Sequence, residues 1–230
     1  MRYFCFYCFL TLLFHTTSFA QVTNSDRLFK MATDYVKEKR YAEAVSIFEE
    51  LAQNNEHDAQ YNLAFLINGG KGTTKNYSEA LFWAFLSKLG KIEKAEELSA
   101  DLVKLLPEKA SKDVRGKVLE HLLARFEDKD KTVLMELGDF HLFVLDEQDF
   151  ENAYLWYNVA SALGVENSSG KRDKVEKKLE PDTIIKVQTA SRKRYEEFTK
   201  IKELEHETNE EINKVTALAK QMKEFLNQKK

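Results

Sequence analysis

Apolar side chains recur every three or four positions through most of the chain, which is the spacing of amphipathic helices. Met31 and Tyr35 fall on one such face, Ala44 and Phe48 fall on the next, and a charged stretch at 37–40 separates the two. The sequence contains only two prolines, and it lacks the alternating apolar and polar runs that are typical of strands. The pattern therefore predicts an all-α protein.

The apolar faces come in successive pairs with polar connections between them, which is the pattern of αα-hairpins. The expected helices pair as 28–35 with 44–51, 61–66 with 77–89, 92–106 with 114–126, 133–144 with 150–163, and 175–179 with 183–198. One pair cannot bury its apolar face alone, whereas stacked pairs cover one another. We therefore expect residues 21–198 to form a right-handed α-solenoid of about five αα-hairpins.

The second and fourth expected pairs repeat one frame of residues. The frame is a leucine with a small residue after it, an alanine, a tryptophan, a second small residue and a glycine, represented by Leu63, Ala64, Ala80, Trp83, Ser87 and Gly90 in one pair and by Leu137, Gly138, Ala153, Trp156, Ala160 and Gly164 in the other. Small residues let two helices approach closely, and a tryptophan fills the wedge between neighbouring pairs. A glycine at the helix end is expected to adopt the left-handed conformation that stops the helix.

Residues 69–72 are three glycines and a lysine, a composition that could indicate a phosphate-binding loop. Such a loop has the pattern G-x-x-x-x-G-K-[ST] and leaves a strand. Here Lys71 is followed by Gly72, and the residues before the loop have helical spacing. We therefore interpret these glycines as the reversal between the two helices of one pair.

The segment 69–90 and, more closely, the segment 150–188 resemble Sel-one-like repeats, whose pattern includes L-G, a glycine loop and A-x-x-W-x-x-x-A-A-x-x-G. The first expected pair looks more like a tetratricopeptide repeat, with Tyr41, Ala44 and Phe48 in its pattern. The resemblance implies a helical scaffold that binds other proteins, and it favours a bacterial envelope. It does not name a partner.

The first twenty residues have the features of a signal peptide. Arg2 provides the positive start, an uncharged apolar run occupies 4–14, and Ser18 and Ala20 are the small residues before the expected cleavage point. The apolar run is about half the ~20 residues that a transmembrane helix needs. We expect secretion across the inner membrane into the periplasm, and an uncleaved anchor is the alternative.

Removal of this segment also removes both cysteines, Cys5 and Cys8, so the mature chain has no disulfide and no thiolate ligands. The net charge of the whole chain, −3, becomes −4 without Arg2, and this charge gives no reason to expect a nucleic-acid partner. No two histidines have metal-site spacing. We expect no metal and no cofactor.

One pattern with catalytic associations occurs, the S-x-x-K match from Ser168 to Lys171. We place this match in a polar loop, where the serine and the lysine would not lie one helical turn apart. We therefore expect no enzymatic activity. The alternative, a periplasmic binder or hydrolase of cell-wall fragments, follows from the resemblance, because disulfide-rich relatives were proposed to have β-lactamase activity.

Five side chains are candidates for a concave groove that would bind a peptide or a partner protein: Phe82, Phe85, His141, Tyr154 and Tyr157. Taken singly, each of the four aromatic residues fits core packing better than groove lining, and His141 fits a packed or groove-facing residue better than a metal ligand.

The C-terminal stretch 199–230 contains no glycine or proline, and apolar residues follow a heptad spacing from Phe198 to Leu226. This spacing suits either a coiled coil that forms a homo-oligomer or a single long helix that caps the solenoid. The sequence as a whole predicts an exported adaptor protein.

Overall fold

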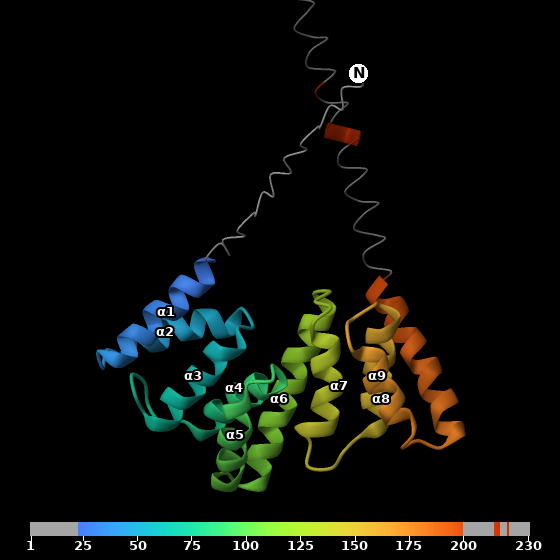
Figure 1. Cartoon of the computed structure of the whole chain (residues 1–230), viewed down its shortest axis with the longest axis horizontal. Helices are drawn as coiled ribbons and strands as arrows, with labels where there is room; N and C mark the ends of the chain where they lie inside the picture. Colours follow the sequence, from blue (N-terminus) through green and yellow to red (C-terminus); the bar gives the residue numbers. More distant parts are fainter. Residues whose placement is uncertain (1–22, 200–213, 217–219, 221–230) are drawn as a thin grey trace, which may run out of the picture.

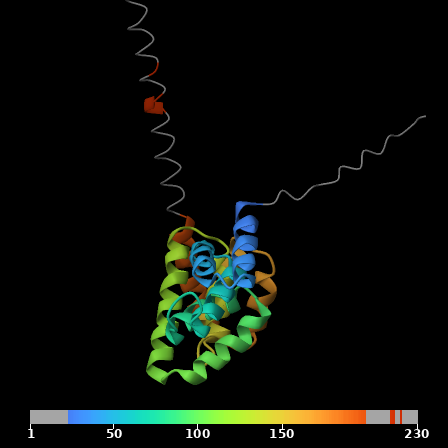
Figure 2. The same cartoon turned by 90° about the vertical axis from the view of Figure 1, so that its left-hand side faces the viewer.

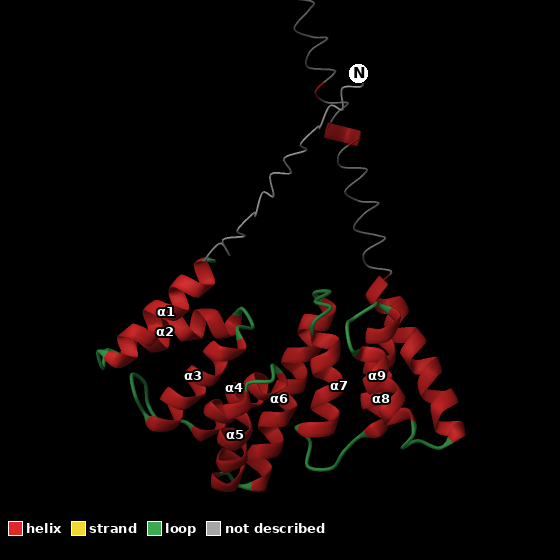
Figure 3. Cartoon of the chain, viewed as in Figure 1, coloured by secondary structure: helices red, strands yellow, loops and turns green. Residues whose placement is uncertain are grey.

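The computed structural model describes residues 23–199, 214–216 and 220, and over these residues the protein is an all-α helical repeat solenoid (Figures 1 and 3). Nine helices have labels: α1 (Asn24–Lys37), α2 (Tyr41–Gln53), α3 (His57–Gly69), α4 (Tyr77–Leu89), α5 (Glu93–Leu105), α6 (Glu108–Glu127), α7 (Val133–Phe143), α8 (Phe150–Ala162) and α9 (Ser168–Glu176). Residues 181–199 are also helical. The described part contains no strand, so the prediction of an all-α fold is confirmed.

Helices that are adjacent in sequence pack against one another, as the apolar pattern predicts. α1 packs on α2, α3 on α4 and α7 on α8, and further contacts of α2 with α3 and of α8 with α9 connect the successive pairs. Figure 1 shows the resulting series from α1 at one end to 181–199 at the other.

The third expected pair departs from this arrangement. α5 packs on α4, whereas α6 packs on α4 and α7 rather than closely on α5. Figure 2 shows the two helices in green and yellow-green, running in different directions from a shared corner. Pro107 lies at this corner as the N-cap of α6 and has extended backbone angles (φ −57°, ψ 146°). The hairpin expected from 92–106 and 114–126 is therefore splayed.

Side-chain caps fix where several helices begin. Thr23 and Asp26 form a reciprocal capping box at the start of α1. Asn76 accepts a hydrogen bond from the Glu79 backbone N–H at 3.2 Å. Asp149 accepts the equivalent bond from the Asn152 backbone N–H at the start of α8, at 3.0 Å. Each cap satisfies an N–H group that has no partner within its helix.

The two tryptophans of the repeat frame pack differently: Trp156 lies between neighbouring elements, whereas the ring contact of Trp83 is with Phe82 of its own helix. Trp156 is buried, and its ring lies 5.2 Å from the Phe126 ring of α6 (centroid to centroid). The guanidinium of Arg194, from the helix 181–199, lies 5.8 Å from the Trp156 centroid. Trp83 is half-buried and packs edge-on against Phe82 at 4.9 Å. Trp156 thus fills a wedge between neighbouring pairs, as expected.

The remaining leucine and alanine positions of the frame are core residues. Leu63, Ala80, Leu137, Ala153 and Ala160 are all fully buried.

Gly72 and Gly164 have left-handed φ angles of +78° and +71°, as expected for residues that reverse the chain. The expectation is wrong for Gly90, whose φ is −72°, because the left-handed residue is the next one, Lys91, at φ +68°. A Cβ atom at Gly90 would lie 1.9 Å from Cγ of His57, so this glycine serves a close contact between α4 and α3.

Phe198 packs the helix 181–199 against α6. Its side chain is 1% exposed, and its ring lies 5.3 Å from that of Phe126. The expected signal peptide at 1–20 and most of the expected C-terminal helix at 199–230 lie outside the described residues. Among the residues that the structure describes, no helix combines the length and the apolar character that crossing a bilayer requires.

Candidate functional site

The exposed large apolar side chains of the described chain are mainly on the first helices of the pairs. Met31 on α1, Phe65 on α3, Leu105 on α5 and Phe143 on α7 are between 39% and 56% exposed. The described residues outside these helices add only Ile185 and Val215. First helices of regularly stacked pairs, here α1, α3 and α7, share one side of a solenoid, and solenoids bind their partners along such extended surfaces.

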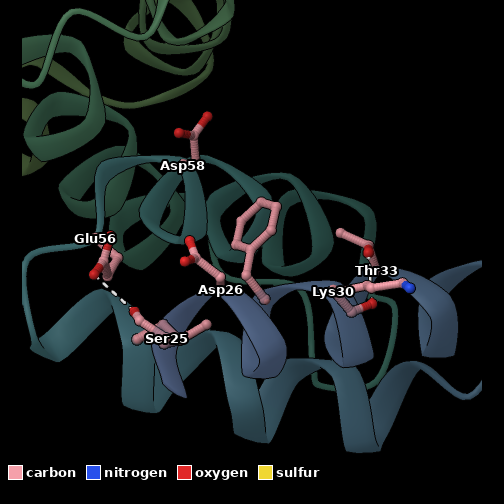
Figure 4. A pocket seen from close by; sticks show the side chains of 8 residues that line it. Ser25, Asp26, Lys30, Thr33, Glu56 and Asp58 are labelled. Carbon is pink, nitrogen blue, oxygen red and sulfur yellow. Dashed lines mark hydrogen bonds between the residues drawn. The ribbon is translucent and has the colours of Figure 1, made fainter. Parts of the chain in front are cut away.

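One hollow of about 360 Å³ lies between α1 and α3 (Figure 4). It is lined by Ser25, Asp26, Phe29, Lys30, Thr33, Leu51, Glu56 and Asp58. The Ser25 hydroxyl donates a hydrogen bond to Glu56 Oε1 at 2.7 Å, which joins α1 to the start of α3 at one end of the hollow. Asp26 is already engaged in the capping box, and its hydrogen bonds to the Thr23 backbone and side chain lower the pKa of its carboxyl.

Asp58 differs from the other two acidic side chains of this hollow. Its carboxylate is exposed and makes no hydrogen bond or ion pair with any residue in the described part of the chain. Tyr61 and Phe65 follow Asp58 at intervals of three and four, so all three side chains share one face of α3. The rings of Tyr61 and Phe65 stack at 6.4 Å. This face of α3 therefore carries a free carboxylate near its start and aromatic surface further along.

A second hollow of about 360 Å³ lies where the α4–α5 turn meets α7 and α9. Asp139 of α7 lines it, although the residue is only 1% exposed. Lys91 Nζ lies 2.5 Å from Asp139 Oδ2, Lys171 Nζ lies 2.6 Å from Oδ1, and the Tyr157 hydroxyl donates to Oδ1 at 2.5 Å. Burial, and then the neighbouring Asp139 carboxylate, raise the pKa of Tyr157, so its hydroxyl stays a donor.

A buried ion network adjoins this hollow. Arg125 of α6 makes a bidentate contact with Glu136 of α7, at 2.7 and 2.9 Å, and also binds Asp130 at 2.7 Å. Glu136 Oε1 lies 3.8 Å from His57 Nε2 at the start of α3. The Arg125–Glu136 pair links α6 to α7, Glu136 also approaches the His57 ring of α3, and bidentate pairs of this kind restrict relative orientation.

Three of the predicted groove residues are core residues. Phe85, Tyr154 and Tyr157 are 3%, 1% and 0% exposed. Tyr157 packs so closely on Gly138 that a Cβ atom there would lie 2.3 Å from the tyrosine ring. The Tyr154 hydroxyl donates to Glu176 at 3.0 Å. The expectation that these three side chains line an open groove is wrong, because the helices that carry them are enclosed by neighbours.

Phe82 is half-buried, and its ring lies 5.9 Å from the His121 ring of α6. His141 is 7% exposed, and its Nδ1 atom makes no hydrogen bond with any described residue. Asp149 Oδ2 lies 3.4 Å from that atom. Burial lowers the pKa of His141, and the nearby carboxylate of Asp149 opposes this shift only in part. His141 therefore belongs to the packing of α7 rather than to an open surface.

The S-x-x-K match lies on a helix and not in a loop, which corrects the expectation from sequence. Ser168 is the first residue of α9, so Lys171 follows it by about one turn. The Ser168 side chain is nevertheless buried, and its hydroxyl donates to the Val165 carbonyl at 2.5 Å. Lys171 is held by Asp139. Both side chains thus have structural contacts in place of a nucleophile–base contact.

The described residues contain no group of three or more His, Cys, Asp or Glu side chains that is arranged to hold a metal ion.

Sequence reasoning missed Asp139 and its two lysines. One signal was available, because Glu136 and Asp139 interrupt an otherwise apolar stretch at 133–140. A carboxylate within a buried helix face needs a partner of opposite charge. The spacing along the chain did not indicate which lysines supply it.

No family model and no curated protein matches the chain. Among solved structures, the chain is similar to a protective antigen present in uropathogenic Escherichia coli strains that displays an SLR fold, with 17% identity and a TM-score of 0.34. The match covers 76% of this chain and 46% of the antigen, so the chain spans less than half of that protein.

Proposed function

We propose that this protein is an exported, non-enzymatic scaffold of the Sel-one-like repeat type, which binds a segment of another protein along its first helices. The observation that supports this proposal most is the position of the exposed large apolar side chains. Four of the six in the described residues lie on α1, α3, α5 and α7. Apolar side chains in such positions offer a partner surface whose burial is favourable.

The buried ion contacts also support a binding role. Asp139 joins side chains from the α4–α5 turn, from α8 and from α9, and the Arg125–Glu136 pair joins α6 to α7. Contacts of this kind hold successive pairs in one relative orientation. A surface that is ordered before binding loses less conformational entropy when a partner arrives.

Export is proposed from the charge and apolar pattern of residues 1–20, and self-association is proposed from the heptad spacing of the C-terminal residues.

Site-specific photocrosslinking in the native cell tests the binding surface. A photoreactive phenylalanine analogue is placed at Phe65 or Phe143 on first helices, or at the exposed positions Ser46 and Lys117 on second helices. We expect a discrete crosslinked partner from Phe65 or Phe143 and none from Ser46 or Lys117. Equal crosslinking from both groups, or none from the first helices, would contradict the proposal.

The wall-fragment alternative gives a different result. In that case the purified protein is retained on peptidoglycan in the absence of any protein partner, and the first-helix positions give no protein crosslink.

A further inference from the structure

We infer that the hollow between α1 and α3 accepts a Lys or Arg side chain of the partner segment, while an apolar residue of the same segment covers Tyr61 and Phe65. This inference rests on the proposed function and names the chemistry of the partner at one position along the first helices.

The charge of the hollow favours a cation. Its lining contains three carboxylates, from Asp26, Glu56 and Asp58, and one ammonium group, from Lys30. The first two carboxylates accept hydrogen bonds from neutral groups, which leave their negative charge uncompensated. The Asp58 carboxylate has no hydrogen-bond or ion-pair partner among the described residues. An incoming ammonium or guanidinium group therefore meets net negative charge, whereas an acidic segment is repelled.

The hollow also contains apolar surface, which distinguishes it from a solvated acidic patch. Phe29 and Leu51 line it, and the Phe29 ring is held edge-on against Phe48 at 5.7 Å. Lys and Arg side chains pair an apolar stem with a charged end, so they can cover such surface while the charge reaches a carboxylate. A purely apolar occupant would remove Asp58 from water without giving it a partner, which is unfavourable.

The spacing on α3 sets the spacing in the partner. Phe65 follows Asp58 by seven residues, which corresponds to about 10 Å along a helix. An extended peptide covers roughly the same distance with three residues, at about 3.3 Å for each. A basic residue and an apolar residue two to four positions apart would therefore reach both parts of the α3 face at once.

Peptide binding to the purified mature chain tests the inference. The probes are fluorescent dodecapeptides in a Gly-Ser background that carry one Arg and one Leu two, three, four or eight residues apart. Matched peptides replace Arg by citrulline, which has the same shape without the charge, or by Glu. The protein variants are Asp58→Asn, the double variant Glu56→Gln with Asp58→Asn, and Phe65→Ala. Asp113→Asn, at an exposed position on α6 with no ion pair in the described chain, is the matched control.

We expect the Arg peptides with spacings of two to four to bind more tightly than the citrulline, Glu and spacing-of-eight peptides. Asp58→Asn should weaken the Arg peptide roughly two- to fivefold, which is the usual effect of an exposed ion pair, and the double variant should weaken it further. Raising the salt concentration should weaken the Arg peptide but not the citrulline peptide. Asp113→Asn should change neither, and thermal unfolding checks that every variant is folded.

Two results would overturn the inference. Binding of the citrulline or Glu peptides as tight as that of the Arg peptides would show that charge does not select the partner here. Unchanged affinity of Asp58→Asn, or no binding of any peptide, would place the contact elsewhere. If crosslinks from Phe65 or Phe143 persist in either case, the binding function stands and only the cationic partner is excluded.

Discussion

Replacing Lys91 and Lys171 together should destabilise the fold by more than the two single replacements add up to. Both ammonium groups bind Asp139, whose side chain is only 2% exposed. After either single replacement by methionine, the carboxylate still has one lysine and the Tyr157 hydroxyl. After both, the carboxylate is buried with a phenol as its only partner among these groups.

The exposure of each lysine sets the expected size of its effect. The Lys91 side chain is 59% exposed, so water already screens its charge, and Lys91→Met should lower the free energy of unfolding by about 0.5 kcal/mol. Lys171 is 32% exposed and donates to both carboxylate oxygens, so Lys171→Met should cost about 1–2 kcal/mol. The double variant leaves an uncompensated buried charge and should lose about 3–5 kcal/mol. The excess over the sum is then about 1–3 kcal/mol.

Urea unfolding of the wild type, both single variants and the double variant at neutral pH measures this excess directly. Lys94→Met is a suitable control, because Lys94 is exposed on α5 and makes no ion pair within the described residues; its effect should stay within about 0.5 kcal/mol. If the double variant loses only the sum of the single losses, to within about 0.5 kcal/mol, the two lysines do not substitute for one another and the reasoning is refuted.

Three further outcomes are expected from the packing. Gly90→Ala should cost about 1–3 kcal/mol, since the new methyl group would overlap the His57 ring, whereas Gly116→Ala has open space on α6 and should gain up to about 1 kcal/mol; chemical denaturation compares the two. Trp156→Ala should cost about 3–5 kcal/mol, measured in the same way, because it empties a wedge between neighbouring pairs. Burial lowers the pKa of His141, so the unfolded chain binds a proton at this residue more readily than the folded chain does. The contribution of neutral His141 to stability is therefore complete above about pH 6.5, the ordinary pKa of histidine, and it is lost as the pH falls below that value. Unfolding curves at pH 8 and pH 5 should show a smaller loss for His141→Leu than for the wild type, and an equal loss would contradict this assignment.

The helical pairs could be predicted from sequence because their signal is local. The spacing of apolar residues along each helix depends only on which side of that helix is buried. The repeated residue frame that contains Trp156 indicates where neighbouring pairs pack against each other. The splay of α5 from α6 has no such local signal. Both helices have an apolar side, and whether the two sides meet each other or meet α4 depends on the whole stack.

The Asp139 contacts could not be predicted for a related reason. Lys91 and Lys171 lie 48 and 32 residues from Asp139 in the sequence, and many other lysines are equally near. Only the folded stack selects these two. The role of Gly90 could not be predicted either, because its close contact is with His57, which lies 33 positions earlier in the sequence. The left-handed backbone conformation expected at Gly90 is found at Lys91.

The helices that enclose the core also decide where a partner could bind. α4 packs on α3, α5 and α6, and its buried residues point to several sides: Ala80, Leu81, Ala84, Phe85, Leu86, Ser87 and Leu89. When a helix is apolar on most sides, neighbouring helices cover those sides, and no face remains exposed to bind a ligand. α1, in contrast, fully buries only Ala32. Phe85, Tyr154 and Tyr157 are therefore needed inside the protein, whereas the first helices keep exposed side chains, such as Phe65 and Asp58, that can meet a partner.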